Sequence, residues 1–548
     1  MNTKKLNSKR KKTHSKKDIT TNKPETSENT LASFSDKHKG LLVLISCMAF
    51  FVIGLIYYYN SIKVSSYKNA GLLFILMAFI LTELLIILFF YIRSKSFSLE
   101  KAGIFVLAIL GTLYMMVFTP SSIPDEVTHF KAAYKYSNYI TFNFDDTSET
   151  LNMRNCDYDV LKRSSIHLSY KQYQNVFHNF KLFADKSDTE KFECETTTIT
   201  NRPLAYIPAA LGIATARFLH LGGYPAYYMG RFFNLAFYLI FMRLALKKLP
   251  IGKIALIIGG MLPMMLHITA SYSYDNFSIA LCSYLTAYLI DCIVSHDKKV
   301  NIKDIIVITV LSCLVVPYKI VYLGIPFLIF LISKEKFEGK KFEIKKIHLL
   351  LKFLVILITA VALIIVQTTA FENLNSSESG NAGLNNYHTF SMLLENLTET
   401  FCMFFRSFEV NGTFYVNSFL GYSLGWFQIN IPVYTMYAFM FILLASFMRK
   451  EDEPAPIKIL PKLFLTVLFL GMSLLILLSM ILGYTPTSVN YAYGVQGRYW
   501  LPLLLFIMLI FRNDWITLSK KADKYLLFAA GFLNMWVLQK YLVEILKV

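Results

Sequence analysis

Long apolar runs separated by short polar segments dominate the chain from residue 41 onward. Several of these runs exceed eighteen residues, the length that a helix needs to cross the hydrocarbon layer of a bilayer. The pattern predicts thirteen helical spans, at 41–59, 71–92, 102–119, 229–247, 251–270, 276–295, 303–317, 319–333, 347–370, 430–448, 460–484, 498–512 and 524–546. The sequence therefore predicts an all-α polytopic membrane protein.

Two long polar segments, 120–202 and 371–429, interrupt this pattern. A further apolar stretch, 203–219, is short and contains Pro208, so we expect a helix that lies at the membrane surface and does not cross. Four regions follow from this spacing. They are a tail at 1–40, two additional spans at 41–100, a main membrane domain at 101–515 and a C-terminal span at 516–548.

The distribution of charge orients these spans. The chain has 548 residues and a formal net charge of +19, which could indicate a nucleic-acid partner. However, the first 39 residues hold eleven Lys or Arg and four acids, and most of the remaining excess lies in short loops between spans. Cations on one side mark the cytoplasmic side of membrane proteins. We therefore expect a cytoplasmic, disordered tail, two long segments on the extracellular face of the cell membrane, and no nucleic acid.

Candidate chemistry gathers at the predicted outer ends of the spans. Asp125 and Glu126 follow the run 102–119 directly, in the sequence Pro-Asp-Glu-Val-Thr-His. A helix over 125–139 would place His129 on the face of these acids, where the group could accept a proton from a hydroxyl or hold a divalent cation. The same residues also fit a plain acidic helix start outside the membrane.

Three further outer residues join this candidate site. Asp275 begins the sixth span, and Arg498 begins the twelfth, within Gly-Val-Gln-Gly-Arg-Tyr-Trp. Guanidinium is well suited to phosphate, although Arg498 and its aromatic neighbours also fit an interfacial belt. Lys319, between two short apolar runs, is a lone outer cation, which fits either phosphate contact or snorkelling. Arg231 is a weaker example of the same kind, and Glu83 lies deep in the second span.

These residues resemble a known group of proteins. The acid pair after a span, the long outer segment and the surface helix Arg-Pro-Leu-Ala-Tyr-Ile-Pro at 202–208 resemble the GT-C superfamily of integral-membrane glycosyltransferases. Within it, the motifs around Asp125, Asp275 and Arg498 resemble bacterial membrane proteins grouped as domain of unknown function 2142. The resemblance covers roughly residues 100–515.

The resemblance implies a GT-C-like bundle and a glycosyltransferase. Such an enzyme would pass a sugar from a polyprenyl-phosphate donor to a wall polysaccharide, a teichoic acid or a protein, with inversion at the anomeric carbon. It implies catalysis by Asp125 with Glu126, and donor-phosphate binding by Arg498, Lys319 and Arg231. Substrate contacts would come from a further set of residues, namely His129, Asp275, Gln496 and Tyr499.

Several alternatives stay open at this level. The resemblance leaves a metal, Mg or Mn, as an alternative at Asp125, Glu126 and Asp275. The chain also fits a transporter or flippase of lipid-linked saccharide, or a glycopolymer assembly protein. The sugar, the acceptor, the oligomeric state and the pairing of Cys156 with Cys194 are not determined by the sequence.

Overall fold

The computed structural model describes residues 26–63, 69–197, 203–338, 344–375, 387–455 and 457–547. The chain falls into two compact units, residues 1–54 and 55–548. Most of the predicted disordered tail lies outside the described residues. Helix α1 (Thr26–Lys63) begins well before the predicted boundary at residue 40, and its first part is what the structure describes of the first unit.

Eight helices of the described chain are long and apolar enough to cross a membrane. They coincide with eight of the predicted spans, which confirms an all-α polytopic membrane protein. These helices are α1, α2 (Ala70–Arg93), α3 (Leu99–Val117), α8 (Gly223–Lys248), α11 (Asp275–Val294), α13 (Ile344–Asn375), α17 (Ile459–Tyr484) and α19 (Ala522–Lys547).

The other five predicted spans are shorter or interrupted, so the prediction of thirteen full spans is not supported. Proline explains several of the breaks, because it removes a backbone donor and resists the helix interior. Pro263 and Pro326 each begin a new helical segment, and Pro502 lies within a 3-10 turn. The shorter elements are α9 (Lys253–Gly260), α10 (Pro263–Thr269), α12 (Ile302–Val315), η2 (Ile320–Tyr322), η3 (Pro326–Leu331), η4 (Lys334–Lys336), α16 (Val433–Phe447), η6 (Gly497–Leu503) and α18 (Leu504–Phe511).

The first long polar segment forms a small folded unit. Strands β1 (Thr150–Arg154) and β2 (Lys191–Glu195) pair antiparallel, with Leu151 opposite Cys194. The helices around them are α4 (Glu126–Ile140), α5 (Asn155–Arg163), α6 (Tyr170–His178), η1 (Ser187–Thr189) and the expected surface helix α7 (Pro203–Phe218). Helix α7 packs against α4 and α8. Cys156 and Cys194 are free thiols, so the structure has no disulfide between these two residues.

The second polar segment contains a helix that we did not predict. Helix α15 (Leu397–Leu420) follows the short α14 (Phe390–Glu395), and strands β3 (Ser423–Leu424) and β4 (Ile429–Asn430) form a hairpin after it. Helix α15 packs against η6 and so supports the segment that carries Arg498. The described part of the polar segment 371–429 therefore contains helical structure that its sequence pattern did not predict.

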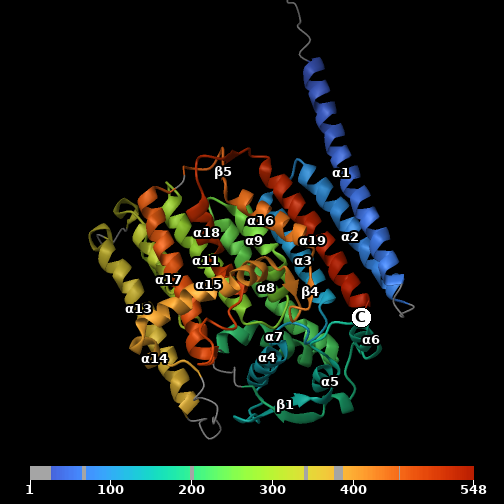
Figure 1. Cartoon of the computed structure of the whole chain (residues 1–548), viewed down its shortest axis with the longest axis vertical. Helices are drawn as coiled ribbons and strands as arrows, with labels where there is room; N and C mark the ends of the chain where they lie inside the picture. The colour runs from blue at the N-terminus through green and yellow to red at the C-terminus, as the bar shows by residue number, and fades with distance from the viewer. Residues whose placement is uncertain are drawn as a thin grey trace, which may run out of the picture. The chain divides into compact units, whose positions relative to one another are not determined.

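Two opposite ends can be defined within residues 55–548. We call the end with Asp125, Asp275 and Arg498 the site end; Figure 1 shows β1 and α4–α7 gathered there. We call the other end the basic end. There, Lys253 pairs with Glu100, the backbone N–H of Gly252 donates to Glu453, and Arg512 pairs with Glu453. Strands β5 (Arg449–Lys450) and β6 (Thr517–Leu518) pair at the basic end.

Candidate functional site

Asp125 lies in the turn between α3 and α4. Its backbone is left-handed, with φ of 60°, a conformation that Asp tolerates better than most residues. The side chain makes no capping hydrogen bond to the helix and is 53% exposed. The expected helix begins one residue later, at Glu126. Asp125 is therefore a carboxylate at the site end that a ligand can reach.

Glu126 has the opposite surroundings, although it is the next residue. Both carboxylate oxygens accept from Arg231 of α8, at 2.8 Å and 2.6 Å, and both side chains are fully buried. The other Arg231 donors meet the carbonyl oxygens of Met115, Phe118 and Thr119, which end helix α3. This pair joins the α3–α4 turn to α8.

The Glu126–Arg231 pair corrects two predictions. Because all five guanidinium N–H groups of Arg231 are engaged, none remains for a donor phosphate. Glu126 likewise has no exposed oxygen for a metal or for proton transfer. Both residues hold the turn that presents Asp125, and neither lines the site.

Asp275, Lys319 and Arg498 form a continuous chain of charges. Asp275 is the first residue of α11 and is 5% exposed. One of its oxygens pairs with the Lys319 ammonium, and the other lies 3.3 Å from Nε of Arg498. Nη2 of Arg498 lies 3.9 Å from Oδ2 of Asp125. The structure therefore brings together the two acids and the late arginine that the sequence predicted to meet.

Arg498 is buried but weakly bound. Its side chain is 7% exposed, and Nε has no hydrogen-bond partner in the described chain. Gly497 fixes the position of η6, because a Cβ there would meet the backbone of Tyr415 and Phe419. A buried guanidinium normally engages most of its five donors. The Arg498 guanidinium is therefore positioned by its surroundings while keeping donors for another group.

Aromatic side chains line this cluster, and sequence reasoning had named Tyr499 alone among them. The Lys319 ammonium lies over the rings of Tyr274 and Tyr499, at 4.8 Å and 5.2 Å from their centroids. His129 is buried, with Nδ1 2.8 Å from the Tyr206 hydroxyl, and its ring meets Tyr274 edge-on. The sequence signal that could have identified Tyr274 as part of the site was its position directly before Asp275.

A cavity of about 300 Å³ adjoins the cluster behind Lys319. Tyr274, Lys319 and Tyr499 form the wall that it shares with the charged residues, and Gln367 of α13 and Ser479 of α17 line it farther away. The cavity is therefore partly polar and lies between two membrane-spanning helices, next to the buried ion pairs.

Two candidates lie apart from the cluster. Gln496 precedes Arg498, and its Oε1 is buried without a hydrogen-bond partner among the described residues, but no contact joins it to the acids. Glu83 of α2 is exposed on its helix, and among the described residues no hydrogen bond or ion pair joins it to the cluster.

The metal site that the resemblance left open does not fit the residues as the structure places them. Within the described ranges, no group of three or more His, Cys, Asp and Glu side chains is placed to hold a metal ion. Glu126 is fully engaged by Arg231, and Asp275 is neutralised by Lys319 and Arg498. Of the three residues at which a metal was left open, Asp125 alone has free coordinating capacity.

Comparison with known proteins places the chain in a family. Residues 107–507 match DUF2142, described as predicted membrane protein, and this match covers more than half of the chain. The chain belongs to the DUF2142 family. No curated protein and no solved structure matches it.

The DUF2142 match contains every residue of the charged cluster. Helices α2 and α19 lie wholly outside the match, because they cover residues 70–93 and 522–547. The family description agrees with a multi-pass membrane protein and assigns no activity. The resemblance to GT-C glycosyltransferases stays a prediction.

Proposed function

We propose that this DUF2142 protein is a membrane glycosyltransferase that moves a sugar from a polyprenyl-phosphate donor to a cell-surface acceptor. We place the reaction at the site end and the site end on the extracellular face. The excess of cations in the loops of the basic end supports this orientation. Asp125 acts as the general base and Arg498 as the phosphate-binding residue. Asp275 and Lys319 position Arg498.

The arrangement around Arg498 carries this proposal. A cation that is 7% exposed, with donors left over, lies between an exposed carboxylate and a buried one. The four charges, Asp125, Asp275, Lys319 and Arg498, sum to zero without a substrate. An anionic phosphate that displaces Asp125 from Arg498 keeps the guanidinium paired and frees the Asp125 carboxylate to accept a proton.

The chemical step is a single displacement. Asp125 takes the proton from the acceptor hydroxyl while that oxygen bonds to the anomeric carbon. The bond from this carbon to the phosphate oxygen breaks, and its electron pair leaves with the phosphate. Because negative charge grows on the phosphate, Arg498 stabilises the transition state more than the ground state. At about 4 Å and an effective dielectric of 20, one such charge pair contributes roughly 4 kcal/mol.

The cavity behind Lys319 supports a lipid-linked donor. It lies between α13 and α17 and shares Tyr274, Lys319 and Tyr499 with the cluster. Aromatic faces beside a cationic cluster suit a sugar phosphate, since sugar C–H groups can pack on the rings of Tyr274 and Tyr499 while the Arg498 guanidinium meets the anion. A substrate with a hydrocarbon tail could approach this chamber from the lipid.

The decisive test is sugar transfer by the purified full chain in vesicles with a labelled polyprenyl-phosphate sugar. Asp125→Asn should lower transfer by about 10²–10⁴, the usual contribution of a general base. Asp145→Asn is the matched control, because Asp145 is an exposed acid of the same segment that pairs with Lys191. Equal activity in the two variants would refute the role of Asp125.

The phosphate role needs a second comparison. Arg498→Gln should weaken use of the donor more than use of the acceptor, whereas Arg406→Gln should change neither, since Arg406 pairs with Glu399 at the surface. A carrier gives a different result. Exchange of the labelled lipid between leaflets, without cleavage and with equal rates in all variants, would favour the transporter alternative.

A further inference from the structure

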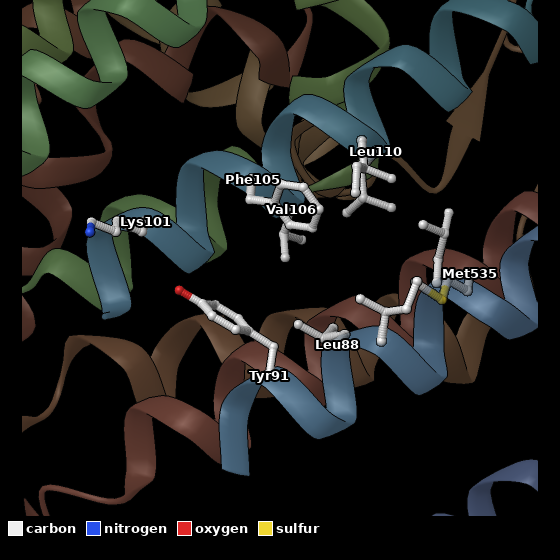
Figure 2. Close-up of a pocket in the computed structure, with 10 residues that line it drawn as sticks. Leu88, Tyr91, Lys101, Phe105, Val106, Leu110 and Met535 are labelled. Atoms are coloured by element: carbon white, nitrogen blue, oxygen red, sulfur yellow. The ribbon is translucent and has the colours of Figure 1, made fainter. Parts of the chain in front are cut away.

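A second cavity lies at the junction of α2, α3 and α19, away from the charged cluster. Its volume is about 400 Å³. The walls are aliphatic and come from all three helices, as Figure 2 shows for Leu88 of α2, Val106 and Leu110 of α3 and Met535 of α19. None of these residues takes part in the proposed transfer reaction.

One end of the cavity is polar. In Figure 2 the Tyr91 hydroxyl and the Lys101 ammonium lie at the same end, opposite Leu110 and Met535. Lys101 is exposed, and neither polar group has a hydrogen-bond or ion-pair partner in the part of the chain that the structure describes. The neighbouring acid Glu100 is neutralised by Lys253. The polar end is therefore cationic and available to an anion.

The cavity opens sideways toward the region where lipid would lie. Ile87 and Phe105 line it and are 50% and 53% exposed. From Lys101 to Leu110 the helix rises about 14 Å at 1.5 Å per residue. This length is close to half of the ~30 Å hydrocarbon core, which is one leaflet. An acyl chain can therefore extend along the cavity while its headgroup stays at the polar end.

We propose that this cavity binds an anionic phospholipid of the leaflet at the basic end. The acyl chain packs against Leu88, Val106 and Met535, and the headgroup phosphate contacts Lys101 and the Tyr91 hydroxyl. Arg93, the last residue of α2, and Lys95, in the turn that follows it, are exposed and add positive charge at the same end. The proposal does not depend on the proposed sugar transfer.

Most residues that line this cavity lie outside the DUF2142 match, so the lipid site belongs to this chain more than to the family region. Helix α3 supplies the wall that continues into the DUF2142 match, whereas α2 and Met535 of α19 lie outside it. Lipid bound at this junction would join the flanking helices to the family domain. Polar groups at the rim and apolar walls inside match the two halves of a phospholipid.

The test captures the lipid in place. The full chain, with Phe105 replaced by photoreactive benzoylphenylalanine, is reconstituted in equal amounts of phosphatidylglycerol and phosphatidylcholine with the same chains, and the captured lipid is identified by mass spectrometry. The matched control carries the probe at Phe441 of α16, an exposed apolar position 73% accessible. We expect the preference for phosphatidylglycerol to be roughly five-fold higher at Phe105 than at Phe441.

Two variants separate headgroup from chain. Lys101→Gln should reduce the preference for phosphatidylglycerol at Phe105 to the value at Phe441. Lys299 is an exposed cation of the basic end, so Lys299→Gln should leave the preference at Phe105 unchanged. Ile109→Trp should fill the cavity and reduce capture of both lipids. Equal preference at Phe105 and Phe441, an unchanged preference in Lys101→Gln, or capture of a second protein copy in place of lipid would overturn the proposal.

Discussion

The buried pair of Glu126 and Arg231 gives the sharpest prediction, because the two carboxylates of Asp125 and Glu126 were expected to share one role. In Glu126→Gln the shape is kept and the charge is lost. The amide has one acceptor oxygen, so its nitrogen would face a guanidinium donor of Arg231. Arg231 would remain fully buried with an uncompensated charge.

The size of the effect follows from burial. Removing one partner of a buried ion pair costs about 3–5 kcal/mol, or roughly 10²–10⁴ in the folding equilibrium constant. The matched control is Glu399→Gln. Glu399 makes the same two-point contact with Arg406, at 2.7 Å and 3.0 Å, but the side chains are 45% and 29% exposed. Solvent screens such a pair, so its loss should change stability little.

The assay is the unfolding midpoint of the purified full chain in detergent, measured together with sugar transfer. We expect a large fall in the midpoint for Glu126→Gln and almost none for Glu399→Gln. The double variant Glu126→Met with Arg231→Leu should recover part of the loss, because no buried charge remains. If Glu126→Gln kept the midpoint of the control while losing transfer, Glu126 would act in the chemistry and the structural role would be refuted.

Three further predictions use other parts of the site end. Asp125→Asn should leave the unfolding midpoint unchanged, because the side chain is 53% exposed and makes no cap; a fall as large as that of Glu126→Gln would contradict this. Gly497→Ala should lower both the midpoint and transfer, since the added methyl meets the Tyr415 carbonyl, at a cost of about 1–3 kcal/mol; unchanged transfer would show that η6 can shift freely. Burial, followed by the neighbouring Asp157 carboxylate, raises the pKa of Cys156 to about 12, so its thiolate is scarce at pH 8. Peptide mapping should therefore find slow alkylation of Cys156 in the folded chain and rapid alkylation after unfolding; equal rates would contradict its burial.

Much of the helical framework was predictable from local sequence. The runs that became α2, α3, α8, α11 and α17 are continuous and apolar, and a lipid environment forces such segments to satisfy their backbone groups as helices. The shorter helices were less predictable, because length and apolar content do not show where proline ends a helical segment. Helix α15 was missed because Glu399, Arg406 and Glu409 lower its apolar content.

The meeting of Asp125, Asp275 and Arg498 was predictable as a shared side of the membrane, since all three stand at span ends of one orientation. The difference between Asp125 and Glu126 was not. Adjacent residues at a helix start point in different directions, and which of them meets Arg231 depends on how α4 and α8 pack across 105 positions of sequence. The partner of Lys319 was equally unpredictable from the sequence, since its ammonium forms an ion pair with Asp275 of helix α11.

The sequence by itself determined that the chain is a helical membrane protein with carboxylates and a guanidinium at one end of its spans. The hydropathy and charge of a residue decide whether it favours lipid or water, and this preference needs no tertiary partner, so the sequence alone reports it. The tertiary structure decided which charges neutralise each other, which donors of Arg498 stay available and where cavities open. Those properties depend on distances of a few ångströms between helices that are remote in sequence, and no local pattern specifies such distances.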